Sequence, residues 1–218
     1  MPEKLNITHC PLCGSADLKP VLTCVDHYAS GEMFHLCSCQ QCGFQFTQDF
    51  PVETAIEPYY ASENYISHSD SREGLMNKLY HYVREKMLLR KAELIEKHSY
   101  LQQGRLLDIG AGTGYFANFM KQRGWVVDAI EKSDQARNFA YENFDLDVYR
   151  PCDIQRLQRG KYDVITLWHV MEHIQDLDKM WDELHRMLDD TGIAIIAVPN
   201  SKSHDAMHYK DNWAAYDV

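Results

Sequence analysis

The sequence predicts an α/β fold, in which helices cover both faces of a parallel sheet and a small cysteine-rich module comes first. Three observations predict it. Short apolar runs alternate with amphipathic segments from Arg105 onward, two C-x-x-C-G segments lie near the N-terminus, and a glycine-rich turn follows the first apolar run. We therefore expect a module over residues 1–50, a connector and long helix over 51–100 and a sheet domain over 101–218.

The N-terminal module contains two cysteine pairs of the same form, "CPLCG" and "CQQCGF". Two thiolates three residues apart on a tight turn can face one ion, and the glycine that follows permits the positive φ that turns backbone N–H groups toward sulfur. The spacing predicts a zinc ribbon whose single structural zinc is bound by Cys10, Cys13, Cys39 and Cys42. A closed site of four thiolates leaves no position for a substrate.

Other interpretations of these cysteines are a redox C-x-x-C pair or thiols without a metal. Cys37 makes the second segment "CSCQQC" and could compete as a ligand, but only Cys39 recreates the form of the first pair. We therefore expect Cys24, Cys37 and Cys152 to be free thiols.

The elements of the sheet domain follow in order after a turn-rich, tyrosine-rich connector over 50–71. A long helix is expected over 72–98, because Leu75, Leu79, Tyr82, Leu89, Ala92 and Ile95 recur at near-helical spacing. Strands are then expected from Arg105, Trp125, Leu146, Tyr162 and Gly192, with helices over 115–123, 134–143 and 176–188. The strands are continuously apolar, which is typical of a parallel sheet buried on both faces.

The glycine-rich turn "DIGAGTGY" lies where parallel sheets bind ligands, at the carboxyl end of the first strand. Its glycines let the backbone pass close to a ligand. A dinucleotide fingerprint would need a glycine where Tyr115 stands, and Asp108 would repel a pyrophosphate but suits an ammonium group. Glu131 ends the second strand, where a carboxylate can accept both hydroxyls of a ribose.

Four segments in this order resemble the motifs of class I S-adenosylmethionine-dependent methyltransferases, which have a Rossmann-like sheet. They are "LLDIGAGTG", "VVDAIEKS", "CDI" at 152–154 and "YDVITLWHVMEHI". The last is similar to the group that includes ubiquinone-type O-methyltransferases. With the zinc ribbon in front, the chain also resembles bacterial enzymes that act on nucleotide-linked deoxysugars and on glycan or secondary-metabolite precursors.

The resemblance implies a set of cofactor-binding residues. It puts Asp108, Gly110 and Gly112 near the methionine part, Glu131 on the ribose, Asp153 and Ile154 at the adenine, and Trp168 and His169 along the floor of the site. The remaining members are Ala111, Gly114 and Lys132, together with Tyr65, which with His68 could belong to a lid formed by the connector.

The sequence departs from the family at its end. The family's sheet closes with an antiparallel strand pair, whereas only "SKSHDAMHYKDNWAAYDV" follows Asn200 here. We expect this C-terminal strand pair to be missing, which leaves the activity of the chain open. His204, Asp205 and His208 in this segment could form a substrate wall or a metal site, but a solvated loop is favoured.

Methyl transfer from a sulfonium requires alignment, exclusion of water and, for a weakly acidic nucleophile, a base. The candidates follow the fourth strand: His169, Glu172 and His173, of which 169 and 173 would share a face of a helical turn. Imidazole can take up a proton near neutral pH, so the two histidines are the candidate catalytic residues. Capping or packing is the alternative role for Glu172 and His173.

Composition limits the classes of partner. The formal net charge is −10, which opposes generic binding to nucleic acid or anionic membranes. No apolar run reaches the roughly 20 residues of a membrane span, and we expect a cytoplasmic enzyme acting on a small molecule, with no prediction of its oligomeric state. A zinc-ribbon RNA methyltransferase is disfavoured because 1–50 carries only two lysines, and a non-catalytic cofactor-binding subunit is the other alternative.

Overall fold

The computed structural model describes residues 4–27, 30–52, 55 and 75–216. The chain forms two compact units, one of residues 70–198 and one that combines residues 1–69 with residues 199–218. These units differ from the predicted domains, because 101–218 was predicted to form one domain. The segment after the last strand of the sheet lies with the N-terminal module and not with the sheet.

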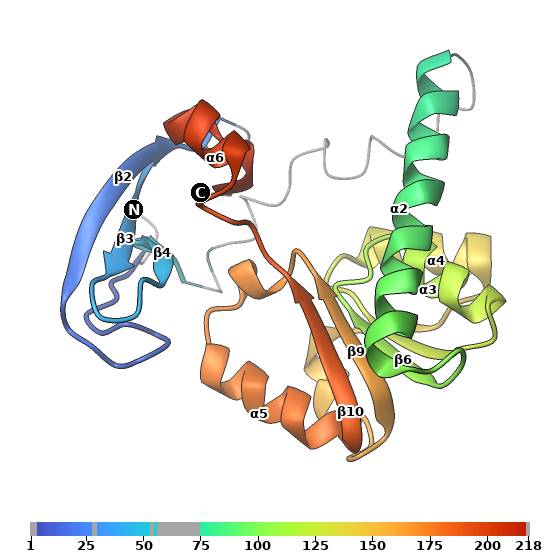
Figure 1. Ribbon diagram of the computed structural model, residues 1–218. Helices are drawn as coiled ribbons and strands as arrows, with labels where there is room; N and C mark the ends of the chain where they lie inside the picture. The colour runs from blue at the N-terminus through green and yellow to red at the C-terminus, as the bar shows by residue number, and fades with distance from the viewer. Residues whose placement is uncertain (1–3, 28–29, 53–54, 56–74, 217–218) are drawn as a thin grey trace. The chain divides into compact units, whose positions relative to one another are not determined.

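The larger unit is built on a five-stranded sheet in the order β10-β9-β6-β7-β8, and every pairing in it is parallel (Figure 1). The α/β class and the parallel sheet predicted from the sequence are thus confirmed. Among the described residues the sheet has no sixth or seventh strand. The strands are β6 (Arg105–Ile109), β7 (Val126–Ile130), β8 (Val148–Tyr149), β9 (Tyr162–Trp168) and β10 (Leu188–Ala197).

Helices cover both faces of this sheet because side chains alternate along each strand. Leu106 and Val164 pack with α2 and α3 on one face, while Leu107 and Ile165 pack with α5 on the other. Small side chains let α4 approach β7 and α3 closely, as Ala117, Ala129 and Ala140 are all buried. The helices are α2 (Leu75–Ser99), α3 (Tyr115–Gln122), α4 (Asp134–Phe144) and α5 (Leu177–Met187), with 3₁₀ turns η3 (Pro151–Arg156) and η4 (Met171–His173).

A part-buried hydrogen bond links the two strands on either side of the central β6. The hydroxyl of the fully buried Tyr162, at the start of β9, donates to Oδ2 of Asp128 on β7 at 2.7 Å, across the intervening β6. The ammonium of Lys161 reaches the same oxygen at 2.5 Å. The polar groups that this packing buries are thus paired, as burial requires.

Two details of the predicted elements are wrong. The last strand begins at Leu188 and not at Gly192, because Leu188 already pairs with Tyr162 before a register shift that ends at Ile193. In α2, Tyr82 is exposed, and the stripe that faces the sheet runs through Leu88, Ala92 and Ile95.

The smaller unit is a β module. Strand β1 (Lys4–Leu5) pairs with β5 (Phe50–Pro51), and β2 (Leu18–Val25), β3 (Met33–Cys39) and β4 (Gln45–Gln48) form an antiparallel sheet. The C-terminal segment folds as α6 (His204–Tyr209), η5 (Lys210–Asn212) and η6 (Ala214–Tyr216), and η5 lies against β2. The loop expected over His204–His208 is therefore a short helix, capped by the Ser203 side chain at the N–H of Ala206.

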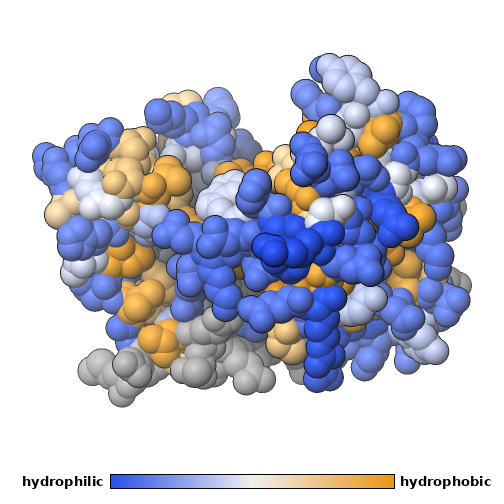
Figure 2. Space-filling model, turned by 90° about the horizontal axis from the view of Figure 1, so that it is seen from below, coloured by the Kyte–Doolittle hydropathy of each residue, from blue (hydrophilic) through white to orange (hydrophobic). Residues whose placement is uncertain are grey.

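The outer surface is mainly polar where it can be followed. On the face shown in Figure 2, hydrophilic side chains predominate and hydrophobic ones occur in small groups. In the described part of the chain, no helix has both the length and the apolar character needed to cross a membrane.

Candidate active site

The glycine-rich turn links the end of β6 to the start of α3. The N–H groups of Gly110 and Ala111 both donate to the carbonyl of Ile130, at 2.8 and 3.0 Å, so the turn is fixed to the end of β7. Gly110, Gly112 and Gly114 all have positive φ. A Cβ on Gly110 would lie 2.2 Å from Val170, and one on Gly114 would lie 2.9 Å from Ala140.

Gly112 differs from its two neighbours. A Cβ built at this position meets no atom within 4 Å. Its glycine is therefore not required by packing within the described protein. The open side of Gly112 is a place where a ligand could lie directly against the backbone.

Glu131 connects this turn to the next loop. Its Oε2 accepts the N–H of Gly112 at 2.8 Å and its Oε1 accepts the N–H of Ser133 at 2.9 Å. Only 5% of the residue is exposed. A carboxylate has about four lone-pair positions, so two remain on these oxygens for further donors such as ribose hydroxyls.

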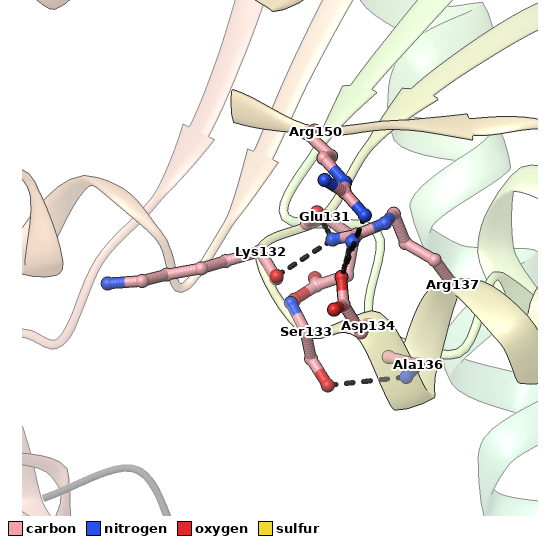
Figure 3. Close-up of polar contacts among 7 residues, drawn as sticks. All are labelled: Glu131, Lys132, Ser133, Asp134, Ala136, Arg137 and Arg150. Atoms are coloured by element: carbon pink, nitrogen blue, oxygen red, sulfur yellow. Dashed lines mark hydrogen bonds and ion pairs between the residues drawn. The ribbon is translucent and has the colours of Figure 1, made fainter. Parts of the chain in front are cut away.

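Figure 3 shows the polar contacts that fix the loop after Glu131. Arg137 donates to the carbonyls of Glu131 and Lys132, each at 2.7 Å, and pairs with Asp134. The Lys132 side chain points away from this cluster. The Ser133 hydroxyl caps α4 at the N–H of Ala136, so the loop enters the helix in a fixed direction.

Asp108 is a buried acid at the end of β6. It lies beside Thr166 in the register of β6 and β9, and the Thr166 hydroxyl donates to its Oδ1 at 2.7 Å. Burial is the main cause that raises the pKa of Asp108 to about 7, and the charge of Glu131 adds to it. The Thr166 hydroxyl and the charge of Lys91 act in the opposite direction.

The turn η3 carries the two residues predicted at the adenine. Asp153 pairs with Arg156 at 2.8 Å, and Ile154 packs against the core on the α5 face. Arg186 of α5 donates to the carbonyls of Ile154 and Leu157, at 2.9 and 2.8 Å. The turn is therefore anchored to α5 through its backbone.

The residues that follow β9 contain the base candidates. Trp168 ends the strand, and its buried Nε1 has no acceptor among the described residues. His169 has φ of 58°, its side chain is 66% exposed, and its Nδ1 lies 3.4 Å from Oε1 of Glu172. Because η4 spans only Met171–His173, the helical face expected to unite His169 and His173 does not form.

Four cysteines gather in the smaller unit. The sulfurs of Cys10, Cys13, Cys39 and Cys42 lie within 4.8 Å of one another, and the closest pairs are 3.5 and 3.6 Å apart. Sulfurs on a tetrahedron of Zn–S bonds of about 2.3 Å would be about 3.8 Å apart. The arrangement therefore fits a tetrahedral ion without large movement.

The two cysteine turns have the same backbone. Gly14 N–H donates to the carbonyl of Cys10 and Gly43 N–H to that of Cys39, each at 2.9 Å, and both glycines have positive φ. The backbone N–H of Cys42 is the largest of the effects that lower the pKa of the Cys39 thiol to about 6. Cys24, Cys37 and Cys152 lie outside this cluster.

Comparison with known proteins shows the family of this chain. The family model of a methyltransferase domain matches residues 79–217, more than half of the chain. The chain belongs to this methyltransferase family. The resemblance to class I S-adenosylmethionine-dependent methyltransferases is thus confirmed.

The chain is similar to parts of several known proteins. An uncharacterized methyltransferase of Staphylococcus carnosus is 29% identical over 58% of this chain and 64% of its own length. A ubiquinone biosynthesis O-methyltransferase of Rickettsia typhi is 26% identical over 62% of this chain and 57% of its own. A methyltransferase structure from Archaeoglobus fulgidus has a TM-score of 0.47 at 21% identity, covering 60% of this chain and 63% of that one. The match thus spans about three fifths of the length of each relative.

The structure brings most of the predicted cofactor residues to one edge of the sheet. Asp108, the glycine turn, Glu131 and Trp168 lie at or just beyond the carboxyl ends of β6, β7 and β9. Tyr65 and His68 lie outside the described residues. Arg137, Arg186 and Lys91 could not be found from the sequence, because each is a cation within an ordinary amphipathic helix.

The open side of Gly112 gives a test of where the ligand lies. We expect Gly112→Ala to weaken binding of S-adenosylhomocysteine by more than tenfold, because the new methyl would occupy the ligand's space, with a loss of stability of only about 1–2 kcal/mol from the positive φ. Calorimetric titration and thermal unfolding measure the two effects.

Gly110→Ala is the matched control, since its methyl would meet Val170 instead of open space. Its main effect should be a lower unfolding temperature, through overpacking added to the same backbone cost. Unchanged affinity in Gly112→Ala would show that the ligand does not lie against this glycine.

Proposed function

We propose that the chain binds S-adenosylmethionine at the carboxyl edge of β6, β7 and β9 and transfers its methyl group to a small-molecule acceptor. The observation that carries this proposal is Glu131, whose buried carboxylate fixes the open Gly112 beside it and keeps lone pairs for a ribose. Asp108 supplies a carboxylate that can pair with the cofactor's ammonium group. The orphaned Nε1 of Trp168 is a further donor at this edge.

The cofactor would supply an electrophilic methyl group on a sulfonium. The residues of this chain bind and orient it: Glu131 the ribose, Asp108 the ammonium, and Asp153 with the backbone of Ile154 the adenine. Ala111, Gly114 and Lys132 complete the proposed site around the turn and the following loop. Alignment at such a site can account for several kcal/mol of a barrier.

His169 is the proposed base for an acceptor that must lose a proton. Its exposed ring stands at the end of β9, and Glu172 is placed to hold the proton of Nδ1, which leaves Nε2 to accept one from the acceptor. His173 is the second candidate, and it lies in η4, where its N–H donates to the carbonyl of Val170. Acceptors that are amines or anions would need neither.

Zinc is proposed as a structural ion of the smaller unit. Four sulfurs at tetrahedral spacing, two of them buried, and two identical backbone turns support this assignment. The ion would stabilise the module and take no part in methyl transfer.

The acceptor is proposed as a nucleotide-linked sugar or another glycan or secondary-metabolite precursor. Some relatives are named as ubiquinone biosynthesis O-methyltransferases, so a phenolic acceptor is a further class to be tried. The acidic composition supports a small molecule in preference to RNA.

Cofactor binding can be tested through Glu131. S-adenosylhomocysteine should bind and NAD should not, and Glu131→Ala should weaken the binding by ~1–3 kcal/mol because the ribose hydroxyls lose their acceptor. Isothermal titration calorimetry gives both values. Glu142→Ala, an exposed carboxylate on α4, is the control and should bind like the parent. Tighter binding of NAD than of S-adenosylhomocysteine would refute the assignment.

The zinc assignment predicts one zinc ion per chain in elemental analysis. Cys39→Ser should lose the ion and unfold the module, because a ligand thiolate is removed. Cys37→Ser is the matched control two residues away, and it should keep the ion since Cys37 lies outside the cluster. Metal-free protein that retains the module's structure would contradict the proposal.

The role of His169 predicts a loss confined to turnover. His169→Asn suits the positive φ, which asparagine tolerates, and it should lower turnover by ~10²–10⁴-fold while S-adenosylhomocysteine affinity stays unchanged. The assay uses an acceptor identified by mass spectrometry after incubation with a metabolite extract. The exposed His185→Gln is the control. Turnover at the parent rate in His169→Asn would remove this residue from the mechanism.

A further inference from the structure

An open cleft lies at the amino edge of the sheet, opposite the edge that carries the glycine turn. Its volume is about 710 Å³, and most of its lining residues precede or begin β6, β7 and β9. Figure 2 looks toward this end of the strands, and the most hydrophilic side chains in that view gather near the middle of the face. A cleft of this size can hold a small organic molecule.

Three cations line the cleft. Arg105 begins β6, Arg159 lies in the turn before β9, and Lys161 comes directly before that strand. The charge of Lys161 is balanced, because its ammonium pairs with Asp128 at 2.5 Å. In the part of the chain that the structure describes, the guanidinium groups of Arg105 and Arg159 form neither a hydrogen bond nor an ion pair. Both arginines therefore keep their donors for a ligand.

The acids that line the cleft accept hydrogen bonds from the protein itself. Asp163 Oδ2 accepts the backbone N–H of Arg105 at 2.7 Å. Asp189 Oδ1 accepts the N–H and the hydroxyl of Thr191, each at 3.1 Å. The cleft thus contains acids with internal donors and arginines without internal acceptors. This difference favours an anion as the ligand, because an anion would meet the unpaired donors.

The backbone of the sheet unit fixes the segments that carry both arginines. The bond to Asp163 fixes Arg105 at the start of β6. The Gly160 N–H donates to the carbonyl of Arg186 at 3.0 Å, which ties the turn that carries Arg159 to the end of α5. Both guanidinium groups therefore start from fixed backbone positions, which lowers the cost of ordering them around a ligand.

We propose that this cleft binds a small molecule with a phosphate or diphosphate group, and that Arg105 and Arg159 bind that group. A planar guanidinium can donate two parallel hydrogen bonds to a phosphate, so a pair of them suits a diphosphate. The formal net charge of −10 repels anions at long range, so binding depends on these local contacts. The cleft lies at the opposite edge of the sheet from the proposed cofactor site, and the inference does not depend on the proposed function.

The experiment is a calorimetric titration of the whole chain with inorganic pyrophosphate at physiological ionic strength. We expect one pyrophosphate to bind per chain, with S-adenosylhomocysteine present or absent. Arg105→Gln and Arg159→Gln should each lower the affinity for pyrophosphate about 10- to 100-fold, because each removes charge-assisted hydrogen bonds. The affinity for S-adenosylhomocysteine should not change in either variant.

Arg90→Gln is the matched control for the loss of an arginine. It removes an exposed guanidinium of α2 that does not line the cleft, and it should bind pyrophosphate like the parent. Thermal unfolding checks that each variant is folded.

Gly160 offers a second comparison that leaves both arginines in place. Its φ of 56° is one that asparagine and aspartate tolerate, and a Cβ there meets no atom closer than the Leu188 carbonyl at 3.9 Å. Gly160→Asp adds a negative charge at the cleft, whereas Gly160→Asn adds a side chain of the same shape without charge. We expect Gly160→Asp to bind pyrophosphate at least tenfold more weakly than Gly160→Asn.

Two further probes show which part of a ligand is recognised. Inorganic phosphate should bind more weakly than pyrophosphate, since it can meet fewer of the donors. Uridine diphosphate that binds as tightly as pyrophosphate, with the same losses in Arg105→Gln and Arg159→Gln, would support recognition of the diphosphate alone. Tighter binding of uridine diphosphate with those losses would support a nucleotide as the ligand.

The outcomes separate this inference from the proposed function. No binding of pyrophosphate, or equal affinity in the parent, Arg105→Gln and Arg159→Gln, would refute the cleft as an anion site. An equal loss in Arg90→Gln would also refute it, because it would show only a general attraction to positive charge. A parent that binds pyrophosphate as expected but not S-adenosylhomocysteine would support this inference and refute only the proposed function.

Discussion

The carboxylate of Glu131 accepts backbone N–H groups from two segments, and the arrangement of the cofactor edge depends on this interaction. One donor, Gly112, belongs to the turn after β6, and the other, Ser133, belongs to the loop before α4. The backbone of Glu131 is itself fixed, since its N–H donates to Tyr149 of β8. Three neighbouring strands therefore present their ends in one fixed arrangement before any ligand binds, which is the condition for strong binding without reorganisation.

This arrangement was predictable from the sequence where a backbone requirement leaves a residue signature. Glycines at every second position after an apolar run, and an acid at the end of the next run, indicated the turn and Glu131. The two C-x-x-C-G segments indicated the cysteine cluster for the same reason, because a positive φ after the second cysteine demands glycine. The parallel sheet was predicted from the alternation of strands and helices along the chain.

The cations that support the site left no comparable signature. Lys91, Arg137 and Arg186 lie in helices whose outer faces carry many charges, and only the packing of each helix decides which cations face inward. The apolar stripe of α2 was also predicted to include Tyr82. It runs through Leu88 and Ile95 instead, and Lys91 lies close enough to Asp108 for their charges to interact. A small rotation in the assigned stripe thus hides which polar residue of the helix faces the sheet. Assignment of the segment 199–216 to the smaller unit depends on tertiary contacts that periodicity does not record.

His169 has a backbone conformation that a residue with a side chain rarely adopts. Two other residues with positive φ, Tyr100 and Asp145, lie at the ends of helices, where a left-handed residue satisfies the final carbonyls. His169 instead follows a strand, and its N–H donates to Ala197 at the end of β10. The bond fixes the turn of the chain at the edge where the methyl acceptor is proposed to bind. A backbone conformation that costs about 1–3 kcal/mol persists only where surrounding contacts impose it, so the bond to β10 holds the backbone of His169 while its imidazole stays exposed.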